Sequence, residues 1–476
     1  MKVVFVGAGE VGYHVIDALY REGVDIVAVD NNSAVLERLR EDYAITTVLG
    51  NATDSATLDS VDLQHVDLFL AVTDSDETNI IACLMAHDAG AGTKIARVKT
   101  IDLGLKTAVT EERFFGIDLV INPYEVAAEH LEYLVQYPQI TDVHTFLSDR
   151  MMLLRVLIHD GSPLANKRVR DIGPQFQIPG SLLALILRGG EHIIPNGDAE
   201  IHPGDHVYFF AERTRLKKLF RLMHLSANPA HRVYINGGGH IGYALARRLE
   251  LTGMDVRILE INEDRCDFLS EHLDHALVLN MDGSDVNSLK QEGVESADMF
   301  ISLTAEDDIN LMSCMLARTR GAKRTVALVK EQDYIPMLMQ NGCVDIAFSP
   351  RRLTGRKILR FVRGKDVNSF FSFPNSDVEL LEMEIKPGAG CLHAPIMQLG
   401  MPPGMLVGAV KRGEHIFTPR GNDVLEAGDT VLVIQQRRNR QQANALFLHV
   451  PTAEEPTVHE EIMAGPGASA AGGSGR

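Results

Sequence analysis

The residues best suited to chemistry are three glycines near the start of the chain, Gly7, Gly9 and Gly12, which directly follow a run of strand-forming residues. In this context the first glycine makes a tight turn, the second lets the backbone approach a pyrophosphate, and the third lets the next helix pack closely on the strand. Asp30 ends the following predicted strand, where its carboxylate can accept hydrogen bonds from a ribose diol and would repel a 2′-phosphate. The pattern predicts a site for NAD-type or adenosine ligands rather than NADP.

The same pattern occurs a second time, with Gly237, Gly239 and Gly242 in the glycine positions and Glu260 in the place of Asp30. Single glycine triplets arise by chance and an acidic strand end is often only a solvated cap. Two complete copies, each between a strand and a helix, indicate two nucleotide sites instead.

The repeat extends along nearly the whole chain. Residues 69–73 correspond to 300–304 in the glycine-bearing segments, and Gly204-Asp205 corresponds to Gly428-Asp429 in the shorter segments that follow them. A repeat of this length is the signature of duplicated structural units. The order of the parts is therefore a long segment, a short segment, and a second copy of each.

The elements that must hold these residues can be predicted from hydrophobic patterning. In the long segment, continuous apolar runs alternate with amphipathic helical stretches, which indicates a parallel sheet covered on both faces. The predicted strands cover residues 2–6, 25–29, 47–50, 68–72 and 94–98. The shorter segments have strands such as 183–187 and 206–210 between glycine-containing turns, which favours small α+β domains.

A helix is predicted to leave each long segment at an Asn-Pro or Ser-Pro pair, Asn122-Pro123 in the first and Ser349-Pro350 in the second. Asn and Ser are favoured helix N-caps, and Pro is favoured in the first turn because its missing N–H has no partner there.

Further polar residues follow the strands at the carboxyl edge of the sheet, where ligands bind in this fold. Thr73 and Asp74 follow the fourth strand and Arg97 ends the fifth. Thr73 and Asp74 could equally be ordinary helix-capping residues, and Arg97 could bind phosphate or pair with a nearby carboxylate. In the second copy Leu328 replaces Arg97 and Ala305 replaces Asp74, so the two sites are not chemically equivalent.

Composition narrows the class of protein. No apolar run of about 18 residues is present, the N-terminus lacks an export signal, and a net charge of −18 argues against nucleic-acid binding. The five cysteines are scattered without a CxxC pair, so we predict buried thiols rather than a zinc site or disulfides. These features predict a cytoplasmic protein without a nucleic-acid partner.

No set of residues suited to catalysis accompanies the glycine motifs. A dehydrogenase needs a proton-transfer residue beside the nicotinamide, commonly with an orienting carboxylate. His192 and His415 are the nearest candidates, but both follow matching Arg-Gly turns, which a shared hairpin loop explains more simply.

Both glycine motifs, both acidic strand ends and the stretch Thr73–Asn79, in this four-part order, resemble the TrkA family of Trk potassium-uptake regulatory proteins, which have two tandem RCK units. The resemblance implies a peripheral protein on the inner face of the cell membrane that binds NAD+ or NADH, with ATP and ADP as further candidates. It also implies a regulatory, non-enzymatic subunit that gates potassium transport through a separate membrane-embedded Trk subunit, and a homo-oligomeric ring of RCK lobes.

The resemblance places cofactor contacts at matching motif positions. In the first copy these are Gly7, Ala8, Gly9, Glu10, Val11, Asp30, Thr73, Asp74 and Arg97, and in the second Gly237, Gly238, Gly239, His240, Ile241 and Glu260. No catalytic or metal-binding residue is expected.

The expected fold is α/β, with two Rossmann-like parallel-sheet domains, each followed by a small α+β RCK C-terminal domain. The predicted Rossmann domains cover residues 1–123 and 232–350, and the small domains cover 143–227 and 370–451. Residues 452–476, rich in Ala, Gly, Pro and Ser, are predicted to be disordered. Two alternatives stay open: an NAD-dependent oxidoreductase, supported by the glycine motif alone, and a nucleotide-sensing scaffold of another cation transporter, which would share every feature.

Overall fold

The computed structural model describes residues 1–20, 23–99, 116–147, 150–172, 181–225, 228–330, 337–338, 342–362, 367–373 and 376–448. The tail predicted to be disordered, 452–476, lies outside these described residues. Within them, no helix has the length and apolarity needed to cross a membrane.

The first domain contains a six-stranded parallel sheet with the strand order β3-β2-β1-β4-β5-β6, which is the doubly wound order of Rossmann domains. Its strands are β1 (Lys2–Val6), β2 (Asp25–Asp30), β3 (Thr46–Leu49), β4 (Leu68–Ala71), β5 (Thr93–Arg97) and β6 (Leu119–Ile121). Its helices are α1 (Glu10–Tyr20), α2 (Ser33–Asp42), α3 (Ser55–Asp59), α4 (Asp76–Asp88) and α6 (Pro123–Gln136). The predicted parallel sheet is confirmed, and the five predicted strands agree with β1 to β5 within one residue at each end.

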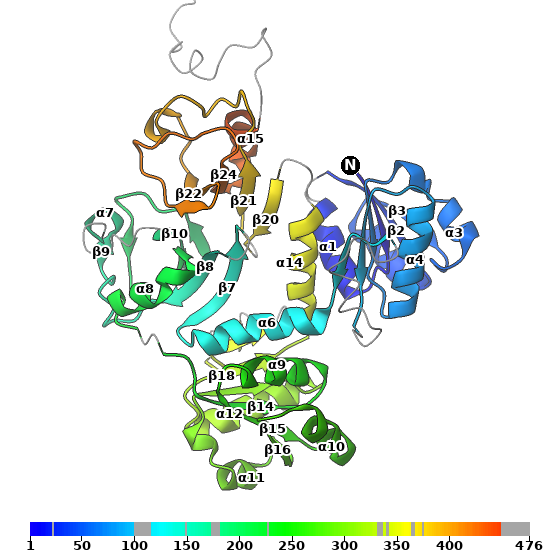
Figure 1. Cartoon of the computed structure of the whole chain (residues 1–476), viewed down its shortest axis with the longest axis vertical. Helices are drawn as coiled ribbons and strands as arrows, with labels where there is room; N and C mark the ends of the chain where they lie inside the picture. The colour runs from blue at the N-terminus through cyan, green and yellow to red at the C-terminus, as the bar shows by residue number, and fades with distance from the viewer. Residues whose placement is uncertain are drawn as a thin grey trace, which may run out of the picture. The chain divides into compact units, whose positions relative to one another are not determined.

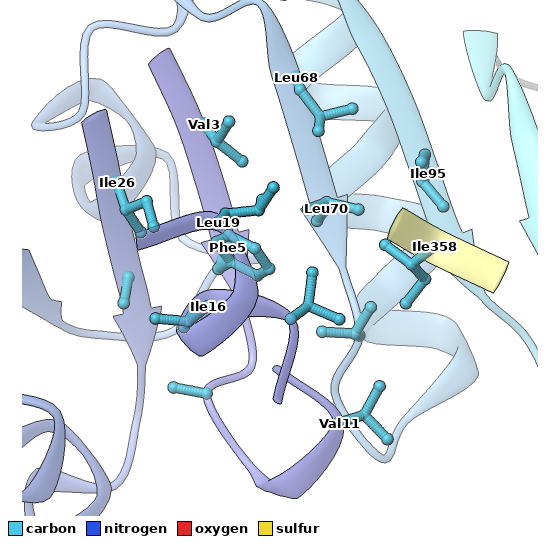
Figure 2. Packing of buried hydrophobic residues seen from close by; sticks show 14 of the residues in the cluster. Val3, Phe5, Val11, Ile16, Leu19, Ile26, Leu68, Leu70, Ile95 and Ile358 are labelled. Carbon is cyan, nitrogen blue, oxygen red and sulfur yellow. The ribbon is translucent and has the colours of Figure 1, made fainter. Parts of the chain in front are cut away.

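Strand β1 shows why the run of apolar residues forms a central strand. Val3 and Phe5 point into one core, and Val4 and Val6 point into the core on the opposite face. All four side chains are buried because helices cover both faces of the sheet. Figure 2 shows Val3 and Phe5 among the apolar side chains of the first of these cores.

The second domain repeats this architecture with the strand order β16-β15-β14-β17-β18-β19. Its strands are β14 (Arg232–Asn236), β15 (Asp255–Glu260), β16 (Leu277–Asn280), β17 (Met299–Ser302), β18 (Thr325–Leu328) and β19 (Ile346–Phe348). Its helices are α9 (His240–Glu250), α10 (Glu263–His272), α11 (Val286–Gln291), α12 (Asp307–Arg320) and α14 (Pro350–Val362).

The helix that leaves each α/β domain packs against the other domain. Helix α14, from the second domain, packs against α1 and adds Ile358 and Leu359 to the first core. Figure 2 shows Ile358 among the side chains of this core. Helix α6, from the first domain, packs against α9 (Figure 1). The two α/β domains thus form one compact unit, built from Met1–Pro138 and Asn228–Val362.

Helices α6 and α14 begin at Pro123 and Pro350, as predicted, but of the two only α6 has a side-chain N-cap. The side chain of Asn122 accepts hydrogen bonds from the backbone N–H groups of Tyr124 and Glu125. In contrast, the Ser349 hydroxyl is buried and has no hydrogen-bond partner among the described residues. Only the backbone carbonyl of Ser349 participates, accepting from Leu353 N at 3.1 Å.

The second compact unit contains the two small domains, each with a five-stranded antiparallel sheet, which confirms their α+β class. The first has β7 (Ile140–Phe146), β8 (Met151–Leu157), β9 (Lys167–Arg168), β10 (Ser181–Arg188), β11 (Glu191–Ile193), β12 (Glu200–Ile201), β13 (His206–Glu212), α7 (Val169–Ile172) and α8 (Leu216–Leu222). The second has β20 (Val367–Ser372), β21 (Val378–Glu384), β22 (Met405–Arg412), β23 (His415–Phe417), β24 (Thr430–Gln436) and α15 (Arg440–Phe447). Phe146 and Phe210 of one sheet share a core with Phe371 and Ile434 of the other.

Candidate functional site

The first glycine turn has the geometry that its spacing predicts. Gly7 adopts φ +91°, and a Cβ atom there would lie 2.7 Å from Thr73 N, so only glycine fits at the tight turn. A Cβ atom at Gly12 would lie 2.1 Å from Gly7 O, which explains the close packing of α1 on β1. A Cβ atom at Gly9 would meet nothing within 4 Å. The backbone at Gly9 is therefore open to a ligand.

Asp30 ties this turn to the end of β2. Its Oδ2 accepts a hydrogen bond from Ala8 N at 2.7 Å, and its Oδ1 accepts one from Asn32 N at 2.9 Å. Each carboxylate oxygen can accept a further hydrogen bond, so Asp30 is able to shape the turn and contact a ribose diol at the same time. Glu10 and Val11 begin α1, and because the Val11 side chain lies in the core, Val11 can offer a ligand only its backbone.

Thr73 is held by a buried asparagine. Thr73 Oγ1 donates to Asn79 Oδ1 at 2.7 Å, and Asn79 Nδ2 donates to the carbonyl oxygens of Thr73, at 3.0 Å, and Arg97, at 2.8 Å. Asn79 is fully buried and thereby joins the ends of β4 and β5. Ser75, rather than Thr73 or Asp74, caps α4, since its side chain accepts from Thr78 N.

Asp74 and Arg97 form an ion pair at this edge, so the structure shows the carboxylate-paired alternative for Arg97. Arg97 Nη1 lies 3.1 Å from Asp74 Oδ1, and Lys99 Nζ lies 3.3 Å from the same oxygen. Partial desolvation by neighbouring atoms opposes ionisation of Asp74, whose side chain is largely exposed, but the charges of Arg97 and Lys99 outweigh it and lower the pKa of this carboxyl group. Lys99 is not among the predicted site residues. The lysine at the matching position of the second copy, Lys330, could have indicated it.

The second glycine turn reproduces the first. Gly237 adopts φ +101°, and a Cβ atom at Gly242 would lie 2.1 Å from Gly237 O. Glu260 accepts hydrogen bonds from Gly238 N at 2.7 Å and from Asn262 N at 2.9 Å, as Asp30 does from its own turn. The structure therefore brings both predicted sets of turn and acidic residues together, with His240 and Ile241 beginning α9.

The two sites differ in the residues around the turn. Leu328, at the position of Arg97, is buried, and Ala305 replaces Asp74. Arg265, a residue that the motif comparison missed, donates from Nε to Gly238 O at 2.7 Å and from Nη2 to Gly239 O at 3.3 Å. A comparison of the helices after the two acidic residues would have found it, because Val35 holds the matching position in α2.

Each glycine turn also touches the other α/β domain. Arg351, at the start of α14, forms an ion pair with Glu10 of the first turn. Tyr124, at the start of α6, stacks on His240 of the second turn with ring centroids 4.7 Å apart. Burial, followed by the charges of Arg265 and Lys99, lowers the pKa of His240, which favours the neutral imidazole in this stack.

The repeated Arg-Gly and Gly-Asp motifs of the small domains form structural ion pairs. Arg188 donates to Asp205 at 2.8 and 2.6 Å, and Arg412 donates to Asp429 at 2.8 and 2.7 Å. Both aspartates are almost fully buried, so these pairs hold the hairpins that carry His192 and His415. In the described part of the chain, no cluster of His, Cys, Asp or Glu suited to a metal ion is present.

The cysteine prediction holds for four of the five residues. Cys83, Cys266, Cys314 and Cys391 are buried free thiols, whereas Cys343 is only half-buried. Burial raises the pKa of the Cys83 thiol to about 12, which keeps it protonated and unreactive.

Comparison with solved structures identifies the fold. The GsuK RCK domain has a TM-score of 0.59 and 18% sequence identity, with 93% of this chain and 94% of that chain covered. The GsuK channel bound to NAD has a TM-score of 0.60 at 18% identity, with 93% of this chain and 78% of that chain covered. At this level of identity the likeness concerns the fold alone.

Comparison with protein families and curated relatives is more specific. The TrkA-N domain matches residues 3–123 and 233–350, and the TrkA-C domain matches residues 153–224 and 380–448. The Trk system potassium uptake protein TrkA of Vibrio alginolyticus is 31% identical over 95% of this chain and 99% of its own length. The protein of the same name from Halomonas elongata is 33% identical over 92% of this chain and 97% of its own length. With two TrkA-N and TrkA-C pairs and relatives aligned over nearly their full length, this chain belongs to the TrkA family.

Proposed function

We propose that this chain is the nucleotide-binding regulatory subunit of a Trk-type potassium uptake system and gates potassium transport through a separate membrane-embedded subunit. The names of the full-length relatives support the transport system. The observation that carries the regulatory role is the first glycine turn, where Gly9 is open and Asp30 stands beside it. Among the residues that the structure describes, no catalytic set accompanies this turn, and we propose a sensor rather than an enzyme.

The proposed ligand is NAD+ or NADH, with ATP and ADP as competitors because all four contain adenosine diphosphate. The turn backbone would hold the pyrophosphate at the positive end of the α1 dipole, and Asp30 would hold the ribose. Arg97 and Lys99 supply positive charge at the carboxyl end of β5, beside Asp74. The proposed contacts are Gly7, Ala8, Gly9, Glu10, Val11, Asp30, Thr73, Asp74 and Arg97, with Gly237, Gly238, Gly239, His240, Ile241 and Glu260 in the second domain.

The contacts between domains support a gating mechanism. Because Arg351 pairs with Glu10 and Tyr124 stacks on His240, a ligand at either turn meets residues that are also held by the other domain. A nucleotide can shift the arrangement of the domains only by binding one arrangement more tightly than another. We propose that the resulting change in domain arrangement is transmitted to the membrane subunit. A homo-oligomeric ring of RCK lobes on the cytoplasmic face of the membrane would transmit it.

The test combines nucleotide titration with potassium flux. Asp30→Ala removes the carboxylate that both shapes the first turn and would bind the ribose, so NADH affinity at that site is expected to fall at least tenfold. Asp25→Asn is the matched control, because Asp25 is exposed at the opposite end of the same strand. In proteoliposomes with the Trk membrane subunit, the response of flux to NADH should disappear with Asp30→Ala and persist with Asp25→Asn. Nucleotide-responsive flux in an Asp30→Ala protein that no longer binds NADH would contradict the proposed role.

A further inference from the structure

The second glycine turn is covered by a side chain of its own domain. Arg265 donates hydrogen bonds to Gly238 O and Gly239 O, at 2.7 and 3.3 Å. Its guanidinium carbon lies 4.4 Å from the centre of the Phe268 ring and 5.9 Å from that of Tyr243. Hydrogen bonds and ring contacts therefore hold the guanidinium in one place against the turn.

Within the described residues, the carbonyls of the first turn receive no equivalent arginine contact. Helices α2 and α10 occupy matching places after the acidic strand ends, and both have an asparagine N-cap: Asn32 accepts from Ala34 N, and Asn262 accepts from Arg265 N. Val35 stands in α2 where Arg265 stands in α10, and a valine side chain has no hydrogen-bond donor. The acidic residues do not account for a difference between the sites, because Asp30 and Glu260 make the same pair of backbone contacts.

Arg265 lies beside the stretch of backbone between the acidic strand end and the glycine turn. In Rossmann domains this half extends from the acidic residue at the end of the second strand to the glycine turn. Here Glu260 accepts from Gly238 N, and Arg265 donates to the carbonyl oxygens of Gly238 and Gly239. Both side chains therefore contact the same short stretch of backbone. A ligand that follows this path would meet the guanidinium beside the turn.

We propose that Arg265 is an internal latch that occupies the second nucleotide site and makes it the weaker of the two. The proposal rests on the nucleotide-binding function proposed above. The first site, with Val35, accepts nucleotide directly, whereas the second accepts it only after Arg265 has left the turn. This change adds to the replacement of Arg97 and Asp74 by Leu328 and Ala305, so the second site is weakened in more than one way.

An arginine beside a glycine turn could instead bind a ligand phosphate, and the two roles predict opposite effects of removing it. Loss of a phosphate-binding arginine weakens binding, whereas loss of a latch strengthens it. The observed contacts favour the latch, because Nε and Nη2 already donate to the protein backbone.

The test is calorimetric titration of the full chain with NADH and, separately, ADP. In an Asp30→Ala background, which isolates the second site, Arg265→Val is expected to tighten binding at least tenfold. In the otherwise unchanged chain, Val35→Arg is expected to weaken the first site by a similar factor. Arg320→Val is the control, because it removes an exposed arginine from α12 in the same domain. Thermal unfolding of each variant shows whether it is folded.

The outcomes separate the latch from the function on which it rests. If the wild type binds nucleotide but Arg265→Val does not bind it more tightly at the second site, the latch alone is overturned. Weaker binding by Arg265→Val would show that Arg265 contacts the ligand instead. Absence of nucleotide binding in the wild type and in both variants contradicts the nucleotide-binding function and the latch together.

Discussion

At the scale of single residues, buried polar side chains that bond to the backbone hold the carboxyl edges of the two parallel sheets. Asn79 and its counterpart Asn310 make the same four contacts in the two domains, each joining a strand end to the helix that follows. Such a residue looks like an ordinary polar position of a helix in the sequence. Its role depends on a carbonyl 18 residues further along the chain, which no local pattern indicates.

Asp298 plays a comparable part at the opposite end of the second sheet, and it gives the chain a predictable acid sensitivity. Its carboxylate accepts from the backbone of His231 and Arg232 and from Lys323 Nζ at 2.7 Å. Partial burial opposes ionisation, but these contacts outweigh it and lower the pKa of Asp298 to about 2.

Because this pKa is lower in the folded chain than in the unfolded chain, the stabilisation is present above about pH 4 and is lost as the pH falls toward 2. We expect Asp298→Asn to lower the free energy of unfolding by about 1–2 kcal/mol at pH 7, with the gap from wild type closing near pH 2. Urea denaturation at a series of pH values measures this. Asp274→Asn, at an exposed position of the same domain, should leave the curve unchanged, and a gap that is independent of pH would contradict the assignment.

At the scale of elements, the strands could be predicted from the sequence, but the destinations of the exit helices could not. Strands β1, β2 and β4 contain continuous apolar runs flanked by turns, so a local pattern determines them. The start of α6 and α14 follows from their prolines. Which domain each helix covers depends on packing between residues far apart in the sequence, such as Gly355 of α14, where a Cβ atom would lie 2.8 Å from His14 Cδ2 of α1.

The exchange of exit helices makes a prediction about stability. Ile358 is fully buried in the first core although it belongs to the second domain's helix. Ile358→Ala removes buried methyl and methylene groups and leaves a cavity, so we expect a loss of about 2–4 kcal/mol. Hydrogen exchange should show faster opening of α1 as well as α14. Leu251→Ala, at a position 84% exposed in the second domain, should cost far less. Opening confined to α14 would show that the helix does not stabilise the first core.

At the scale of the whole chain, each compact unit is made from both copies of the repeat. The α/β unit joins Met1–Pro138 to Asn228–Val362, and the two small domains form the other unit. A chain that simply placed its copies one after another would give each repeat its own core. Here the copies are joined by packed helices and ion pairs, which give a change in one copy a physical route to the other.

The ion pairs between α6 and α9 test this coupling directly. Arg248 Nε lies 2.7 Å from Glu132 Oε2, and both side chains are partly buried, so water screens the pair less than an exposed one. In a double-mutant cycle of Arg248→Ala and Glu132→Ala, we expect a coupling energy of about 0.5–1.5 kcal/mol in the unfolding of the full chain. The pair of Lys357 and Glu129, at 3.3 Å between α14 and α6, has side chains 46% and 34% exposed and should show a smaller coupling. Additive effects of the Arg248 and Glu132 substitutions would mean that this ion pair does not help to join α6 to α9, and coupling between the domains would then have to rest on their other contacts, such as the pair of Arg247 and Glu125.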